Sequence, residues 1–147
     1  MRRRFWRKTG RCLFAVVDTG PLYAAVDEDD ADHVECVEAL ATPGVHLVIP
    51  ALVVAEVTCL IGSRLGPKVE GAFLRSLEEC DVAAPAVEDY KRIGELTERY
   101  GDFPLGGTDA SVIVLAERLK TELVITLDRR HFAAVRPRHC KALRLLP

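Results

Sequence analysis

Four acidic residues stand at positions where their side chains could act together. Asp18 directly follows a short apolar run, and Asp128 follows a second such run late in the chain. Glu56 lies among apolar neighbours in a predicted helix, where a carboxylate is costly to bury unless it is protonated, paired or bound to a cation. Asp109 stands at the start of another predicted helix. Because Mg2+ prefers oxygen ligands and is commonly held by a few carboxylates plus substrate phosphates, the four acids indicate a divalent-cation site.

Each acid taken alone also has an ordinary explanation. Asp18 and Asp128 are residues that form turns. Asp109 could cap its helix, since acids are favoured at helix N-termini. Glu56 could be a partly exposed helix residue. The metal-site hypothesis therefore depends on whether the fold brings the four side chains to one place.

The elements that must position these acids follow from hydrophobic periodicity and from turn residues. Strands are predicted over 13–17, 45–49, 81–83 and 123–126, with a final edge strand at 142–146. Helices are predicted over 20–26, 31–40, 51–65, 68–79, 87–100 and 109–119, with a helical turn at 131–134. Asp30 and Thr108 are the expected N-caps of the second and the last of these helices.

Short apolar strands that alternate with helices predict an α/β fold, a three-layer α/β/α sandwich with a mainly parallel central sheet. In such sheets functional groups collect beyond the carboxyl ends of the strands, near the point where strand order reverses. Asp18 and Asp128 occupy such strand ends, so we expect them at the functional edge of the sheet.

The bulk composition fits a single globular domain. The chain has 147 residues, of which 49% are hydrophobic and 29% charged, and it shows no repeat and no linker-like segment. Its five cysteines are scattered and odd in number, which argues against a disulfide framework or a structural zinc site. We find no apolar run long enough to span a bilayer, and we expect a cytoplasmic protein.

The charge is distributed unevenly along the chain. Residues 1–12 carry six basic residues and no acid, whereas the remainder holds 14 basic residues against all 22 acids. With Phe5 and Trp6, this basic extension could bind a nucleic-acid backbone by charge and stacking. The simpler interpretation, which we favour, is a flexible N-terminal extension that precedes a domain spanning 13–147.

Four segments carry a family resemblance: VVDTGPL at 16–22, PALVVAEV at 50–57, GGTDASVIVLAERL at 106–119 and TLDRRHF at 126–132. In this order and spacing they resemble the PIN domain, and specifically the VapC-type toxins of bacterial toxin–antitoxin pairs. The resemblance extends from residue 13 to the C-terminus. It implies that Asp18, Glu56, Asp109 and Asp128 are the catalytic, metal-binding acids of a PIN-like nuclease domain, with Thr126 as a polar neighbour of the last acid.

The resemblance implies a metal-dependent endoribonuclease, the toxin of a type II toxin–antitoxin system. One or two Mg2+ or Mn2+ ions would activate water and stabilise the leaving oxygen. The expected partners are an RNA substrate, a cognate antitoxin and a second copy of the chain in a homodimer. Candidate RNA contacts come from four basic residues that could equally form a solvated face: Arg129, Arg130, Arg136 and Arg138.

Two other functions remain open. A phosphatase of the haloacid dehalogenase type also places an aspartate after its first strand, but the segment Asp18-Thr19-Gly20 lacks the second aspartate that those enzymes use. A non-catalytic PIN-like module that only binds RNA or protein is the other alternative. Loss of an acid would favour the binding module, and all four acids are present.

Overall fold

The central sheet has five strands, all parallel. A computed structural model of the chain describes residues 13–147. The strands lie side by side in the order β3-β2-β1-β4-β5, and each pairs in parallel with its neighbours. Their bounds are β1 Leu13–Val17, β2 Val45–Pro50, β3 Asp81–Ala83, β4 Leu123–Ile125 and β5 Arg144–Leu146.

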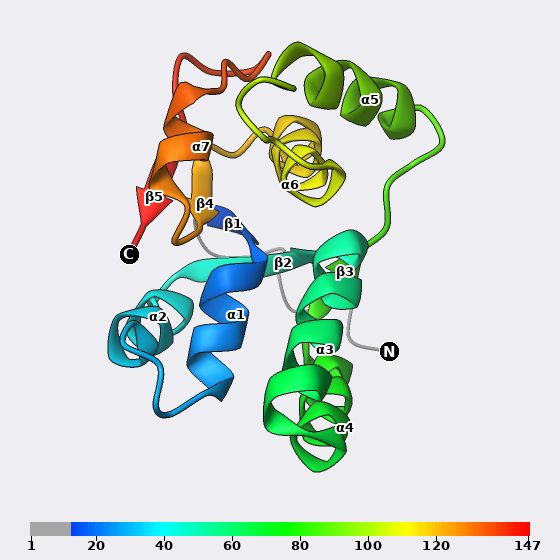
Figure 1. Cartoon of the computed structure of the whole chain (residues 1–147). Coiled ribbons are helices and arrows are strands. Elements are labelled where there is room, and N and C mark those ends of the chain that lie inside the picture. The colour runs from blue at the N-terminus through cyan, green and yellow to red at the C-terminus, as the bar shows by residue number, and fades with distance from the viewer. Residues whose placement is uncertain (1–12) are drawn as a thin grey trace.

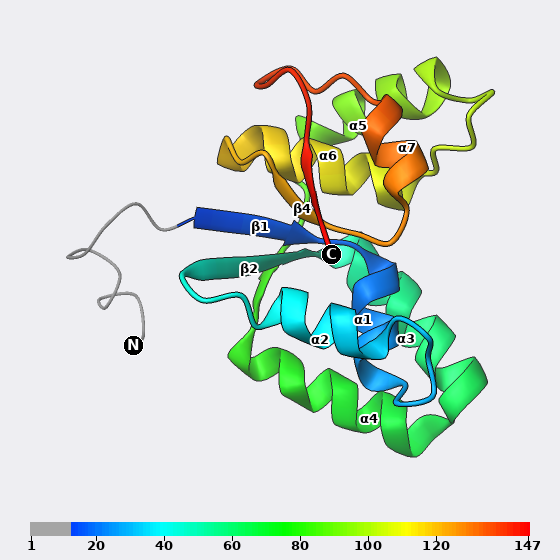
Figure 2. The same cartoon turned by 90° about the vertical axis from the view of Figure 1, so that its left-hand side faces the viewer.

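Helices cover both faces of this sheet. Figure 2 shows α1 to α4 on one side of β1 and β2, and α5, α6 and α7 on the other. The helices are α1 Thr19–Val26, α2 His33–Leu40, α3 Ala51–Leu65, α4 Pro67–Ser76, α5 Asp89–Arg99, α6 Gly107–Leu119 and α7 Arg129–Ala134, with a 3-10 turn at Leu77–Glu79. The predicted three-layer α/β/α sandwich is confirmed (Figure 1).

The core is centred on β1 and β4, two of the three inner strands. Residues 15–17 of β1 and 124–125 of β4 are fully buried, because helices cover both of their faces. Beneath them α3 contributes Val53, Val57 and Ile61, which are spaced four residues apart and form one buried stripe. On the other face α6 is buried from Ala110 to Ala116. The strand ends are therefore held rigidly.

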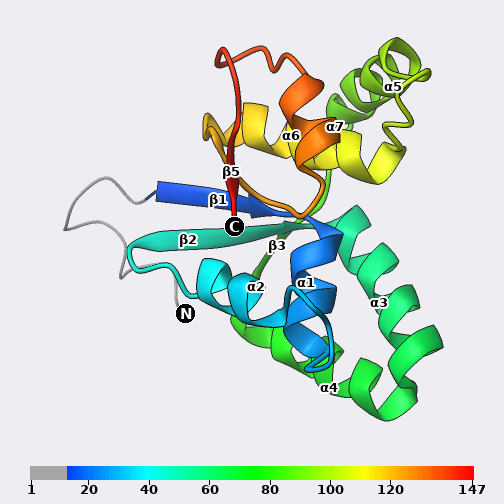
Figure 3. The ribbon, with the colours of Figure 1, turned by 60° about the vertical axis from the view of Figure 1, so that its left-hand side comes forward.

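The strand order reverses at β1, which has β2 on one side and β4 on the other. The backbone amide of Asp18 donates to the carbonyl of Ile125 at 2.9 Å, so the chain ends of β1 and β4 are directly joined. In Figure 3 the ends of these strands lead toward α1 and α7. This is the switch point at which open α/β sheets place ligands.

Some predicted helix boundaries are wrong. α2 begins at His33, and Asp30 is not its cap, because Asp30 Oδ1 accepts from the amide of Asp32 at 2.9 Å in the preceding turn. α6 begins at Gly107, so Thr108 lies inside the helix and is not its cap. The predicted basic extension, 1–12, lies outside the described residues. No helix within 13–147 is long and apolar enough to cross a membrane.

Candidate active site

Asp18 is a buried acid at the end of β1. Only 5% of the residue is exposed, and the side chain accepts a hydrogen bond from Thr126 Oγ1 at 2.7 Å. Burial raises the pKa of Asp18 from 3.8 to about 6, with further contributions from the charges of Asp109 and Glu56, while the hydrogen bond from Thr126 opposes the rise. Asp18 therefore bears a negative charge where the fold disfavours one, as a group that meets a cation would.

Thr126, the residue after β4, connects the first and last acids. It is fully buried, and its Oγ1 also accepts from the backbone amide of Asp128 at 3.0 Å. The sequence placed Thr126 beside Asp128 only. Its hydroxyl in fact fixes the side chain of Asp18 relative to the backbone of Asp128.

Glu56 faces the same region from α3. The side chain accepts from Thr19 Oγ1 at 2.7 Å, and its charge contributes to the raised pKa of Asp18. Glu56 is exposed and is not buried among the apolar residues that flank it in the sequence, as the alternative of a partly exposed helix residue allowed. Thr19 was not predicted as a site residue, although its position directly after Asp18 could have indicated it.

Asp109 lies in the first turn of α6. Its Oδ2 accepts from the amide of Gly106 at 3.3 Å, so it does cap the helix. A carboxylate that only capped a helix would have a lowered pKa. The pKa of Asp109 is instead raised, first by burial and then by the charges of Asp128 and Glu56. Asp109 is thus both a helix cap and a member of the acid cluster.

Asp128 follows β4, and His131 engages both of its carboxylate oxygens. Oδ1 accepts from the backbone amide of His131 at 3.2 Å, and Oδ2 is in close contact with His131 Nδ1. His131 was not predicted as a site residue. The spacing D-x-x-H at the start of a helix was its signal, since residues three apart on a helix are neighbours.

The four acids come from four separate segments and are linked through their charges: Glu56 and Asp109 act on Asp18, and Glu56 and Asp128 act on Asp109. The set supplies only oxygen donors, and a divalent cation would relieve the mutual repulsion, so these residues fit such an ion. Within residues 13–147 no three of these side chains already form a metal-binding cluster. Binding through three carboxylates therefore requires side chains to move closer together.

Four predicted RNA contacts lie in and after α7. All four arginines are exposed. Within the described residues Arg129, Arg130 and Arg136 have no carboxylate partner, whereas Arg138 donates to Glu95 at 3.0 Å. The RNA-binding prediction is best supported for the three arginines without a carboxylate partner.

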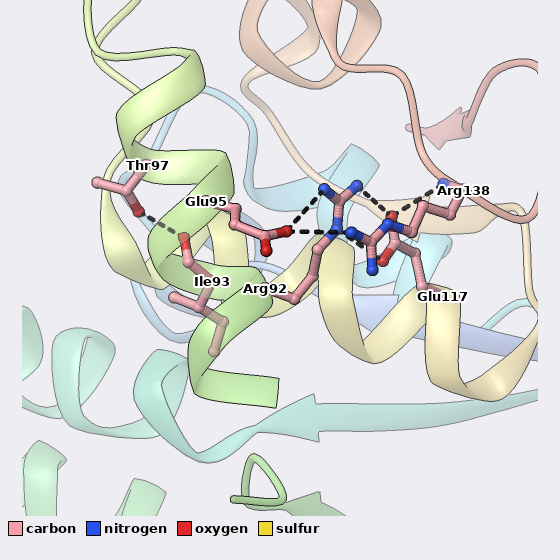
Figure 4. Close-up of polar contacts among 6 residues, drawn as sticks. All are labelled: Arg92, Ile93, Glu95, Thr97, Glu117 and Arg138. Atoms are coloured by element: carbon pink, nitrogen blue, oxygen red, sulfur yellow. Dashed lines mark hydrogen bonds and ion pairs between the residues drawn. The ribbon is translucent and has the colours of Figure 1, made fainter. Parts of the chain in front are cut away.

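An ion-pair network holds the chain segment that follows α7. Arg92 of α5 donates two hydrogen bonds to Glu117 of α6, at 2.9 and 3.2 Å, and the backbone amide of Arg138 donates to the same carboxylate (Figure 4). Burial opposes ionisation of Glu117, but the hydrogen bonds and charge of Arg92 and Arg138 hold its pKa below the ordinary value. The network joins α5, α6 and the C-terminal segment.

The parallel sheet, covered by helices on both faces and with acidic residues beside its switch point, defines a three-layer α/β protein. Residues 15–136 match the family model described as PIN domain. Over 127 residues the chain is 37% identical to ribonuclease VapC26 of Mycobacterium tuberculosis (strain ATCC 25618 / H37Rv). The aligned region covers 83% of this chain and 92% of the relative. The chain belongs to the PIN domain family, and the resemblance to VapC-type proteins is confirmed.

Three solved structures share the fold. The toxin VapC20 of Mycobacterium tuberculosis, which cleaves the sarcin–ricin loop, has a TM-score of 0.75 and 18% identity, and the match covers 86% of this chain and 98% of that one. VapBC2 of Rickettsia felis, bound to a DNA fragment from its promoter, has a TM-score of 0.67 and 15% identity, covering 92% and 100%. A toxin–antitoxin complex from Klebsiella pneumoniae has a TM-score of 0.63 and 21% identity, covering 82% and 92%.

Proposed function

We propose that the chain is a Mg2+-dependent endoribonuclease and the toxin of a type II toxin–antitoxin pair. Ribonuclease activity is the named function of its 37% identical relative, and divalent-metal use is general in the PIN family. The single observation that supports the catalytic proposal is the electrostatic linkage of the acids near the switch point: Glu56 and Asp109 act on Asp18, whose pKa is raised to about 6 chiefly by burial, and Asp128 acts on Asp109.

The residues of the proposed site have two roles, metal binding and orientation of the metal ligands. The four carboxylates hold the ion or ions, and Thr126, Thr19 and His131 orient Asp18, Glu56 and Asp128 respectively. When bound, the metal supplies Lewis acidity that activates water and stabilises the leaving oxygen. Either Glu56 or Asp109 orients the attacking water.

The substrate phosphates must be held beside an acidic pocket. The exposed side chains of Arg129, Arg130 and Arg136 follow Asp128 and have no carboxylate partner within the described residues, so they are the cations best placed to contact the RNA backbone. Cations bound between the carboxylates and a phosphate would remove the repulsion that the acids alone exert.

The proposed antitoxin and homodimer need an apolar surface. On α2, Val34 is 65% and Val37 is 41% exposed, and the two side chains lie three residues apart on one helix face. Two structures with the same fold are VapBC2 of Rickettsia felis and a toxin–antitoxin complex from Klebsiella pneumoniae. We therefore propose an antitoxin partner for this chain as well.

The test is cleavage of RNA by the purified protein in defined metal conditions. We expect no cleavage in excess EDTA and recovery on addition of Mg2+ or Mn2+, because the proposed site offers oxygen ligands only. Mapping of new RNA 5' ends after induced expression would identify the target. Cleavage that persists in excess EDTA would contradict the metal-dependent mechanism, and RNA binding without cleavage in either metal would favour the non-catalytic module.

A further inference from the structure

An aromatic ring and a guanidinium pack together beside the acid cluster. Phe103 lies in the loop between α5 and α6, and Arg130 lies in the first turn of α7. The guanidinium carbon of Arg130 is 5.3 Å from the centre of the Phe103 ring. His131 packs edge-on against the same ring, with centroids 4.9 Å apart and an interplanar angle of 83°. Because His131 also contacts Asp128, only one side chain separates Phe103 from a proposed metal ligand.

We propose that Phe103 and Arg130 form a stacking site for one unpaired base of a single-stranded or looped RNA, next to the bond that is cut. This inference rests on the proposed function and extends it to the substrate. Every nucleobase has a flat face that stacks on aromatic rings and on the plane of an arginine guanidinium. The site therefore selects for an unstacked nucleotide and not for a particular base.

The surroundings of Arg130 favour this role over a purely structural one. Arg130 is exposed and has no carboxylate partner among residues 13–147, and its guanidinium packs over the Phe103 ring. An arginine held against a ring has already lost conformational freedom, so less conformational entropy is lost when a base stacks on it. Arg75 of α4 is also exposed, and it has no aromatic contact and no carboxylate partner within the described part of the chain. Arg75 is not among the proposed RNA contacts, so it is a matched control for the exchange of an exposed arginine for lysine.

The position of the pair assigns the base to the nucleotide at the cleavage site. Arg130 is two residues from Asp128, and the loop that carries Phe103 continues to Gly106, whose amide donates to Asp109. Two of the proposed metal ligands are thus connected to the two halves of the stacking pair. A phosphate held at the acids has its adjoining base within reach of Phe103 and Arg130.

The test compares Arg130→Lys with Arg75→Lys, and Phe103→Leu with Phe103→Tyr, on a short single-stranded RNA that the wild type cleaves. We expect Arg130→Lys and Phe103→Leu to raise KM about tenfold while kcat stays within twofold, because a stacked base contributes about that much to binding. Arg75→Lys lies outside the proposed RNA contacts and should stay within twofold of wild type. Phe103→Tyr keeps the aromatic ring and should restore the KM that Phe103→Leu loses. Thermal melting of each variant reports whether the fold is retained.

A second measurement replaces single bases of the RNA by abasic sites. At one position next to the cut, we expect removal of the base to lower the kcat/KM of the wild type about tenfold. Removal of the same base should not lower the kcat/KM of Arg130→Lys or Phe103→Leu any further, because these variants already lack the stacking contact. Equal effects of Arg75→Lys and Arg130→Lys would overturn the stacking site. The site would also be overturned if the loss from the abasic position and the loss from the protein substitution simply multiplied.

The failure of the stacking site and the failure of the proposed function can be told apart. If the wild type cuts no RNA, the nuclease proposal fails, and the site is then tested by the fluorescence of RNA that carries 2-aminopurine at one position. Quenching by the wild type that is lost in Phe103→Leu and kept in Phe103→Tyr supports the site, and equal quenching by all three proteins overturns it.

Discussion

Replacement of Asp18 by Asn tests the electrostatics of the site through folding stability alone. The pKa of Asp18 is raised from 3.8 to about 6, chiefly by burial. The folded protein therefore holds this proton more tightly than the unfolded chain does. The stability that Asp18 contributes is greatest below pH 3.8, falls as the pH rises from there toward 6, and stays reduced above that value.

The size of this loss follows from the shift. About two pKa units correspond to roughly 3 kcal/mol of unfolding free energy. Asn has a similar shape but no charge, so Asp18→Asn avoids the loss, although its amide adds buried donors that cost about 1–2 kcal/mol if unsatisfied. We expect Asp18→Asn to be about 1–2 kcal/mol more stable than wild type at pH 7.5 and less stable at pH 4.

Urea unfolding in EDTA at pH 4 and pH 7.5 measures both proteins without metal. The informative quantity is the change in the mutant-minus-wild-type difference between the two pH values, which should be roughly 3 kcal/mol. Asp102→Asn, a substitution at an exposed loop residue, serves as the control and should show no such change. A difference that is the same at both pH values would refute the assignment of a buried, disfavoured charge to Asp18.

Four further outcomes are expected. Asp109→Asn should abolish RNA cleavage and lose most of the Mg2+-induced rise in Tm. Without metal the variant should melt no lower than wild type, because Asn still caps a helix. Retained cleavage would remove Asp109 from the site. Glu117→Gln should lower the unfolding free energy by about 3 kcal/mol in urea melts, since the paired side chains of Arg92 and Glu117 are only 12% and 11% exposed. A loss below about 1 kcal/mol would contradict a structural ion pair. Phe132→Ala, at a fully buried ring in α7, should cost about 3–5 kcal/mol in the same assay, unless the neighbouring helices can collapse onto the cavity. Removal of residues 1–12 should leave kcat unchanged and weaken RNA binding modestly at low salt, and unchanged binding would favour a simple extension.

The sequence predicted the strands and the two acids at strand ends because both depend on local pattern. The apolar run of β1 and the β-branched run of β4 are each followed at once by residues that cannot continue a strand, which placed Asp18 and Asp128 at one edge of a parallel sheet. The α2 boundary was wrong because Asp30 binds its own turn, and such local hydrogen bonds compete with helix capping.

The exposure of Glu56 follows from its angular position on α3. The buried stripe of α3 is formed by Val53, Val57 and Ile61, so a residue directly before Val57 lies about a quarter turn away from it. Apolar neighbours in the sequence are not neighbours on the helix surface. Glu56 is consequently exposed. A hydrogen bond from Thr19 connects its side chain to the residue that follows Asp18, and no local sequence pattern predicts this contact between α1 and α3.

The contacts that sequence alone missed are those that make the acid cluster tolerable to the fold. A buried carboxylate such as Asp18 is costly unless donors surround it, and Thr126 supplies one while its oxygen also accepts from the amide of Asp128. The backbone amide of His131 likewise donates to Asp128 Oδ1, and the ring of His131 contacts Oδ2. The cost of charging the acids is offset only in part, because burial first and the neighbouring charges second keep the pKa values of Asp18 and Asp109 raised. A site that is stabilised only in part by its own protein retains affinity for an outside cation, so the remaining electrostatic cost is what metal binding would recover.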